Sequence, residues 1–345
     1  MRRSLCLLVI LVPFLVLAQQ PTRSFEGASR SQIDDDETYV PHIEHPAYEK
    51  DGPVLLLDRA HGNSHFDSAF AKLVSADGYQ VVASRTTFTY DQLSKARVLV
   101  IMNAGLFSTR AWLEDPQPLF TDVEASAVRD WIVAGGSLLF ASGSMTPEAG
   151  QMLLDRLGVE FNFGRIKDDD LFELSPASQP KLPIRQPVFS REKKLLSTHS
   201  IMAGRSESER IGAVSFSDIR SLSKFPKNAV ALMHCSEKAA FIRQDDLVKR
   251  QVLEATRALE KGAKEMQTVE LPKVVPVPVP GIPVAVAFTL GKGRVVVMGG
   301  GSALSSIVRR SELMGNPVSE KIGLGSADNQ KFTLNTMHWL TGVLE

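Results

Sequence analysis

The chain has 345 residues, of which 43% are hydrophobic, and this is enough to bury a sizeable core. Lysine plus arginine and aspartate plus glutamate each number 39, so no basic excess indicates nucleic-acid binding. Two cysteines and seven histidines exclude a cysteine-rich metal scaffold. We therefore expect a globular protein with no nucleic-acid partner, no bound metal and no cofactor.

The first 18 residues have the pattern of a secretory signal peptide. Arg2 and Arg3 precede an apolar stretch from Leu5 to Leu17, and Ala18 offers a cleavage site. A transmembrane helix needs about 20 apolar residues, so an uncleaved anchor is the less favoured alternative. Cys6 lies inside the apolar stretch, which argues against a lipoprotein anchor. We expect a periplasmic or secreted protein that touches a membrane only if this segment remains uncleaved.

Residues 19–52 are expected to form a polar arm or linker. The segment contains the acidic run 34–37 and has no hydrophobic periodicity. His42 and His45 have the spacing of half a metal site, but no second pair follows at ligand spacing. Exposed arm histidines are the simpler interpretation.

From Pro53 onward, strands alternate with helices. Short apolar runs predict strands at 54–57, 79–83, 97–102 and 137–141. Helices are expected at 66–76 and 90–95, after the capping box Thr121-x-x-Glu124, and from Thr146-Pro147. Such alternation is typical of a parallel sheet with right-handed crossovers. The expected fold is therefore an α/β, flavodoxin-like parallel sheet flanked by helices.

Polar residues follow several of these strands directly. The stretches are Asp58–His65, Asn103–Gly105 and Ser142–Ser144. Because ligands in open α/β sheets bind outside the carboxyl ends of the strands, these stretches form the predicted binding edge.

The second half of the domain is expected to hold an insertion and a hairpin. A charged helix is predicted over 245–265, inside an insertion at 236–275. The prolines between 273 and 283 exclude a central strand there. Runs at 284–290 and 294–298 predict a C-terminal β-hairpin, and 329–343 a closing helix. We take 53–345 as one domain.

Four segments resemble a known family. They read LLLDRAHGNSHF (55–66), STHSIMAGRSESERIGAV (197–214), FTLGKGRVVVMGGGSAL (288–304) and NQKFTLNTMHWLTGVL (329–344). Together they are similar to DUF4350-type proteins of the class I glutamine amidotransferase-like superfamily, which also includes ThuA-like proteins and the N-terminal domain of an intraflagellar-transport protein. The resemblance implies an amidotransferase-like α/β fold over most of residues 53–344, with the insertion near 236–275 outside the match.

Two departures from that family imply a degenerate active site. Enzymes of the superfamily carry a nucleophilic cysteine on a sharp strand-to-helix elbow, and here Ser142 stands at the corresponding position with no glycine two residues later. Gly300 replaces the aspartate that the family carries after its hairpin.

The eight residues 58–65 admit two interpretations. Asp58, His61, Asn63 and His65 carry ligand atoms that suit zinc, but Gly62-Asn63 favours a turn in which they would not converge. The favoured alternative is a turn in which Asp58 and Asn63 accept backbone hydrogen bonds and His61 is satisfied by a neighbour. His61 remains a candidate for contact with a polar ligand.

Ser142 also admits two interpretations. It could act as a nucleophile with His61 or His199 as its base, although no orienting acid can be assigned. Alternatively, Ser142 and Ser144 cap the following helix, which we favour.

We expect an exported, non-catalytic protein that binds a small molecule or an envelope protein. The expected ligand-binding residues are His61, Asn63, Asn103, Ser142 and Ser144. The alternative is a hydrolase, acting on carbohydrate as its ThuA-like relatives suggest, that uses Ser142 or a site centred on His61.

Overall fold

The computed structural model describes residues 32–61, 66–103, 118–142, 150–162, 164–174, 185–217, 219–243, 275–313 and 316–345. The predicted signal peptide, Asn63, Ser144 and the predicted helix at 245–265 lie outside these residues. Within the described ranges, no helix combines the length and apolar character needed to cross a membrane.

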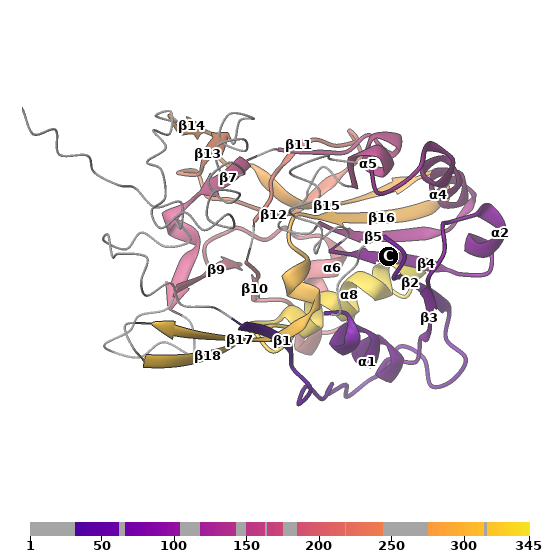
Figure 1. The fold of residues 1–345 in the computed structure, drawn as a ribbon, viewed down its shortest axis with the longest axis horizontal. Coiled ribbons are helices and arrows are strands. Elements are labelled where there is room, and N and C mark those ends of the chain that lie inside the picture. Colours follow the sequence, from indigo (N-terminus) through magenta and orange to yellow (C-terminus); the bar gives the residue numbers. More distant parts are fainter. Residues whose placement is uncertain are drawn as a thin grey trace, which may run out of the picture.

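A seven-stranded sheet forms the centre of the molecule (Figure 1). Its strands, in spatial order, are β12 (Val230–His234), β15 (Pro283–Leu290), β16 (Gly293–Met298), β5 (Ser137–Ala141), β4 (Val98–Met102), β2 (Val54–Asp58) and β3 (Gln80–Ser84). The five from β16 to β3 pair in parallel, whereas β15 and β12 are antiparallel additions. Numbered along the chain, the parallel strands lie in the order 2-1-3-4-5 of flavodoxin-like sheets, which confirms the predicted fold class.

Helices cover both faces of this sheet because its inner strands are apolar on both sides. Every residue of β4 and β5 is buried. Leu55, Leu57 and Val100 face the layer with α1 (Ser68–Ala76), α6 (Ser200–Ala203) and α8 (Asn329–Thr341). Leu56 and Leu99 face the layer with α2 (Tyr90–Leu93), α4 (Asp122–Ala134) and α5 (Gln151–Leu157). The two layers lie below and above the sheet in Figure 1.

A long excursion separates β5 from β16, and it builds three small sheets. They contain β6 (Glu160–Phe161) with β11 (Leu222–Lys224); β7 (Gly164–Lys167) with β13 (Ala240–Arg243) and β14 (Val277–Pro278); and β8 (Phe172–Leu174) with β9 (Arg185–Ser190) and β10 (Ala213–Ser215). The described residues also form 3₁₀ turns at η3 (Asp169–Leu171), η4 (Glu207–Glu209) and η5 (Gly301–Leu304). As the prolines require, β14 lies at a sheet edge. The predicted hairpin is present as β15 and β16.

A further three-stranded sheet was also not predicted from the sequence. It contains β1 (Gln32–Asp35), β17 (Ser306–Leu313) and β18 (Asn316–Gly323). Ion pairs between neighbouring strands join Arg309 to Glu320 at 2.5 Å and Arg310 to Asp34. These strands carry charged residues at positions where most strands carry apolar ones. The alternation of apolar and polar residues that predicts a strand is therefore absent from their sequences.

The rest of the predicted arm lies along α1 and α8. The Tyr39 hydroxyl donates to Gln330 Oε1 at 2.8 Å, and Gln330 Nε2 donates to the His42 carbonyl at 2.6 Å. The Ala47 amide donates to Asp77 Oδ1 at 2.7 Å. Residues 32–48 are therefore bonded to the domain along most of their length.

Candidate functional site

The polar strand ends predicted from the sequence meet at one edge of the sheet. Asp58 ends β2, while Asn103 and Ser142 directly follow β4 and β5. Ser84, which the sequence did not single out, ends β3 at the same edge. The glycines 299–301 follow β16 at the same edge. All four polar residues are buried. This carboxyl edge is where open α/β sheets bind ligands.

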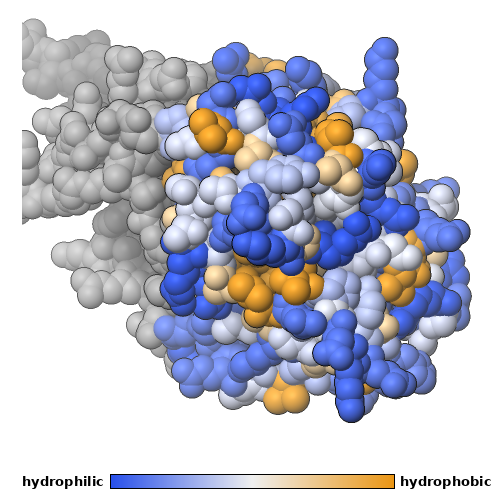
Figure 2. All heavy atoms as spheres, turned by 90° about the vertical axis from the view of Figure 1, so that its right-hand side faces the viewer, coloured by the Kyte–Doolittle hydropathy of each residue, from blue (hydrophilic) through white to orange (hydrophobic). Residues whose placement is uncertain are grey.

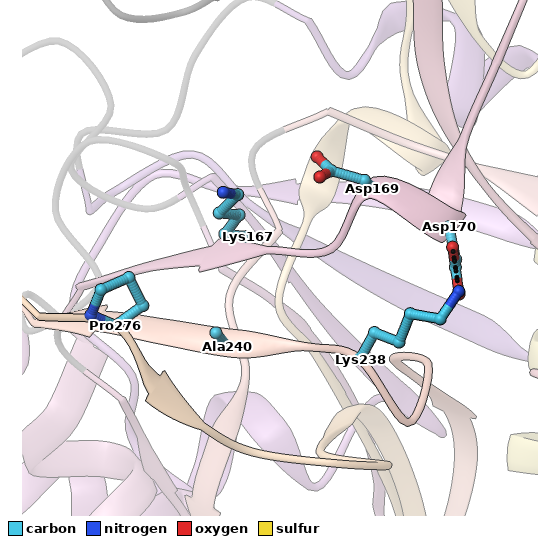
Figure 3. A pocket seen from close by; sticks show the side chains of 6 residues that line it. All are labelled: Lys167, Asp169, Asp170, Lys238, Ala240 and Pro276. Atoms are coloured by element: carbon cyan, nitrogen blue, oxygen red, sulfur yellow. Dashed lines mark hydrogen bonds and ion pairs between the residues drawn. The ribbon is translucent and has the colours of Figure 1, made fainter.

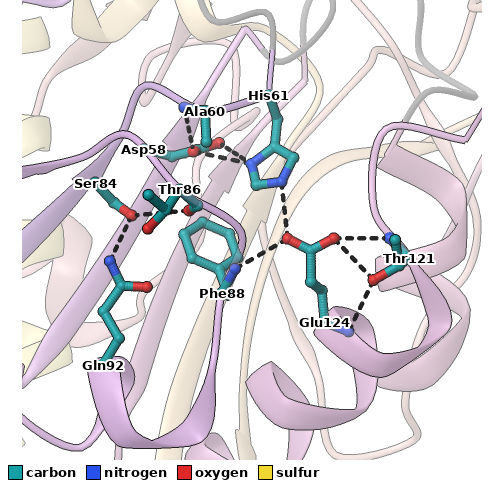
Figure 4. Close-up of polar contacts among 9 residues, drawn as sticks. All are labelled: Asp58, Ala60, His61, Ser84, Thr86, Phe88, Gln92, Thr121 and Glu124. Carbon is teal, nitrogen blue, oxygen red and sulfur yellow. Dashed lines mark hydrogen bonds and ion pairs between the residues drawn. The ribbon is translucent and has the colours of Figure 1, made fainter.

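His61 lies between two buried carboxylates (Figure 4). Its Nδ1 is 2.9 Å from Asp58 Oδ1, and its Nε2 is 3.1 Å from Glu124 Oε1. Asp58 comes from the end of β2 and Glu124 from the first turn of α4, so the imidazole joins a strand to a helix. Both ring nitrogens are engaged, as the favoured turn interpretation requires.

Aromatic rings enclose the imidazole on two sides. The ring centroid of His61 is 4.9 Å from that of Phe88 and 4.3 Å from that of Phe120. Both phenylalanines are buried and belong to the core layer that packs on α4. This apolar surrounding strengthens the attraction between the imidazole and its two carboxylates.

Glu124 is fixed by four hydrogen-bond donors. Its Oε2 accepts hydrogen bonds from the Thr121 amide and from the Thr121 hydroxyl, each at 2.9 Å. Its Oε1 accepts a hydrogen bond from the Phe88 amide at 2.9 Å and also lies 3.1 Å from His61 Nε2. The bond from the Thr121 amide belongs to the capping box predicted at the start of this helix, and the other bond of the box runs from the Glu124 amide to Thr121 Oγ1 at 3.2 Å. The carboxylate therefore combines helix capping with the contact to His61.

The environment shifts the pKa values of this pair in opposite directions. Burial alone would lower the pKa of His61, but the hydrogen bonds and charges of Asp58 and Glu124 raise it above its ordinary value. Burial alone would raise the pKa of Glu124, but its hydrogen bonds from Thr121 and Phe88 and the charge of His61 lower it. The arrangement stabilises an imidazolium between carboxylates.

Two further contacts hold the segment that follows β2. The Ala60 amide donates to Asp58 Oδ1 at 3.0 Å, which is the backbone bond expected of a turn. The Arg59 guanidinium donates to both oxygens of Asp67, at 2.7 and 2.8 Å. Asp67 directly precedes α1, so this bidentate pair ties the residue after β2 to the residue before α1.

Asn103 and Ser142 lie together beside the glycines that follow β16. The Ser142 amide donates to the Met298 carbonyl at 2.9 Å, and the Gly301 amide donates to the Ser142 carbonyl at 3.1 Å. A Cβ added to Gly301 would lie only 2.1 Å from Asn103 Oδ1. Asn103 has a left-handed backbone with φ of 53°, a conformation that asparagine tolerates better than most residues.

His199 lies elsewhere in the fold. It precedes α6, where its Nδ1 accepts from the Ile201 amide at 3.2 Å, and its ring contacts Trp339 at 5.2 Å between centroids. Trp339 packs under Arg294, at the start of β16, whereas Ser142 bonds Met298 at its end. Burial and the charge of Arg294 lower the pKa of His199. The structure brings His61, Asn103 and Ser142 to one edge and places His199 toward the other.

A separate surface hollow lies on the excursion, near β7 and β13 (Figure 3). It is lined by Lys167, Asp169, Asp170, Lys238, Ala240 and Pro276. Lys238 Nζ is 3.1 Å from Asp170 Oδ2, so the charges there partly neutralise each other. No candidate from the sequence belongs to this hollow.

The site residue that sequence reasoning missed is Glu124. The capping box identified it as a helix-capping side chain, but nothing in the sequence connects it with His61. Among the residues that the structure describes, no group of three or more His, Cys, Asp or Glu side chains could hold a metal ion. Asn63 and Ser144, both predicted ligand-binding residues, lie outside that part of the chain.

The fold is similar to that of the mmIFT52 N-terminal domain, with a TM-score of 0.50 and 14% identity over 84% of this chain and 97% of that one. Weaker likenesses include a ThuA-like protein from Parabacteroides merdae (TM-score 0.38, 9% identity, 84% and 90% of the two chains) and a protein described as a GMP synthase component from Thermoplasma acidophilum (TM-score 0.32, 9% identity, 61% and 99%). No protein-family model and no curated protein matches the chain. The likeness to the mmIFT52 domain and the strand order together define a flavodoxin-like α/β protein.

Proposed function

We propose that this protein is a non-catalytic binding protein whose carboxyl edge, around Asn103 and Ser142, receives a small molecule or a segment of a partner protein. The observation that carries the proposal is that both ring nitrogens of His61 already contact carboxylates. A general base needs a nitrogen that can accept a proton from its substrate or nucleophile. Both nitrogens of His61 face carboxylates, at 2.9 and 3.1 Å.

The contacts of His61 give it a structural role instead. It joins the end of β2 to the start of α4, and when protonated it compensates the charge of two buried acids. A histidine that acts as a general acid or base would be expected to keep one ring nitrogen available for proton exchange with the substrate. The rigid strand ends that it supports are suited to holding a ligand in a fixed geometry.

We further propose that the protein acts at the cell envelope, as a periplasmic or secreted protein. The support is the sequence pattern of residues 1–18, a pair of arginines followed by an apolar stretch. Its test is the amino-terminal sequence of the protein recovered from the periplasm or medium of expressing cells. Recovery only from the cytoplasm with Met1 retained would contradict the localisation.

Hydrolysis is the function that the binding proposal must exclude. The purified protein would be assayed on aryl esters and aryl glycosides alongside Ser142→Ala and His61→Gln. We expect no turnover that depends on Ser142. Turnover by the wild type that Ser142→Ala abolishes would overturn the proposal in favour of the hydrolase.

Binding itself is tested by thermal shift with neutral sugars, short peptides and nucleotides. A ligand of the carboxyl edge should raise the Tm of the wild type, because binding to the folded state at about 100 times Kd stabilises it by about 2.7 kcal/mol. Ser142→Ala and Asn103→Ala should each reduce that rise. Lys238→Ala, in the separate surface hollow, is the control that should leave it unchanged.

A further inference from the structure

The two edge strands of the central sheet differ in how well they are protected from pairing with another strand. At one edge, β12 has register shifts after Ala231 and after Met233, and Leu196 forms a bridge to Met233. Irregularity and a covering segment are common ways to block an edge. The β18 edge of the separate three-stranded sheet carries a proline and the charged Glu320 and Lys321.

β3, at the other edge of the central sheet, has none of these protections. Its sequence, Gln-Val-Val-Ala-Ser, contains no charge and no proline, and its pairing with β2 is regular. Val82, at its centre, is 49% exposed, and Tyr90 at the start of the one-turn helix α2 is 48% exposed. No described strand pairs with the outer side of β3 (Figure 1). Separate small apolar patches lie on this side of the molecule (Figure 2).

Two backbone hydrogen bonds fix which groups of β3 face outward. The Gln80 amide donates to the Pro53 carbonyl at 3.1 Å, and the Ser84 carbonyl accepts from the Arg59 amide at 2.8 Å. Gln80 and Ser84 therefore point their backbone groups toward β2. Because these groups alternate along a strand, those of Val81 and Ala83 point away from the sheet.

We propose that β3 binds the β3 strand of a second copy of this chain, in an antiparallel pair centred on Val82. In this register Val82 lies opposite the partner's Val82, and Val81 exchanges both backbone hydrogen bonds with the partner's Ala83. The two-fold axis doubles these bonds to about four. The two central sheets then form one continuous sheet through the interface.

The sequence of β3 suits its own copy better than it suits a charged partner strand. Polar residues at its ends, Gln80 and Ser84, face each other, and the three apolar residues between them also face each other. The first charged residue after the strand, Arg85, falls opposite the partner's Tyr79 and not opposite a second arginine. Like charges directly across a pair would be unfavourable, and this register has none.

The expected dimer is weak. Five paired residues bury less area than the roughly 1,200–2,000 Å² of a stable interface, so association should depend on protein concentration. This proposal is independent of the binding function proposed for the carboxyl edge.

The first test is sedimentation velocity over a concentration series, with wild type, Val82→Lys and Val230→Lys compared. Val230 is the matched control, since it lies on the opposite edge strand with a similar exposed fraction of 43%. We expect wild type and Val230→Lys to dimerise alike and Val82→Lys to weaken dimerisation at least tenfold. A wild type that remains monomeric at every concentration, or a dimer indifferent to Val82→Lys, would overturn the proposal.

The second test does not depend on how well the lysine variant folds. Val82 occupies a non-hydrogen-bonded pair in the proposed register, where opposing Cα atoms lie about 4.5 Å apart, which is within disulfide range. Val82→Cys should therefore form covalent dimers under mild oxidation, whereas Val230→Cys and the wild type, whose Cys235 is buried, should not do so to the same extent. Equal cross-linking of all three proteins would contradict the register.

Discussion

His61 and Glu124 lie 63 residues apart in the chain, yet His61 Nε2 is 3.1 Å from Glu124 Oε1, and both side chains are buried. The contact joins the loop after β2 to the first turn of α4. Because Asp58 holds the other nitrogen, removal of either acid leaves a buried imidazole with a partner missing.

Replacement of Glu124 by glutamine should strongly destabilise the protein. The amide offers one acceptor oxygen in place of two, so at least one of the groups that now donate to Glu124 would meet an N–H. We expect the free energy of unfolding to fall by about 3 kcal/mol, which urea denaturation would measure. Asp130→Asn, an exposed change on the same helix, should cost less than about 0.5 kcal/mol. Equal losses for both variants would contradict the role of Glu124.

The contribution of His61 to stability should depend on pH with a definite sign. Its pKa is raised in the folded state, so its contribution is complete below about 6.5 and is lost as pH rises through the folded value. Glu124 has a lowered pKa, so its contribution is complete above about 4.5 and is lost as pH falls through the folded value. The wild type should therefore exceed His61→Gln in stability most between about pH 4.5 and 6.5. A difference that grows from pH 6.5 to 9 would show the opposite linkage.

Asp77 should hold the arm onto the domain. Its Oδ1 accepts from the Ala47 amide and its Oδ2 lies against His338 Nε2, each at 2.7 Å. Asp77→Asn offers a single acceptor oxygen, so we expect faster hydrogen exchange at Ala47 and a loss of about 2–4 kcal/mol in unfolding free energy. Asp91→Asn, on the exposed surface, is the control. Unchanged exchange at Ala47 in Asp77→Asn would exclude this anchoring role.

Gly301 and Asn103 should be energetically coupled. The methyl group of Gly301→Ala would overlap Asn103 Oδ1, which must then move. We expect Gly301→Ala to cost about 1–3 kcal/mol alone and about 1 kcal/mol less when Asn103 is already alanine. A double-mutant cycle by urea denaturation measures this difference. Strict additivity would mean that the two residues do not compete for the same space.

The sequence predicted the inner strands well because their burial leaves a local mark. Continuous apolar runs such as Val98–Met102 must lie between two helical layers, and they do. The sequences of β1, β17 and β18 contain no such apolar run, because ion pairs such as that of Arg310 with Asp34 join these strands. An alternation of charges resembles a solvated loop until the partner strand is known.

The candidate site was likewise predictable from the sequence only in part. Local sequence placed Asp58, Asn103 and Ser142 after buried strands, and parallel pairing requires those ends to meet at one edge. It also identified Glu124 as the N3 residue of a capping box. Local sequence contains no information that Glu124 and His61 meet, because their contact depends on where α4 packs on the central sheet.

The layered α/β architecture and the edge at which polar residues gather could therefore be predicted from the amino-acid sequence, since both depend on local periodicity and strand direction. What those residues can do depends on contacts that form when the whole chain folds. The tertiary structure placed two carboxylates on the nitrogens of His61, set His199 toward the other end of β16 from Ser142, and left β3 uncovered. Each depends on contacts between segments far apart in the chain, and such contacts are set by packing of the whole fold and not by any local pattern.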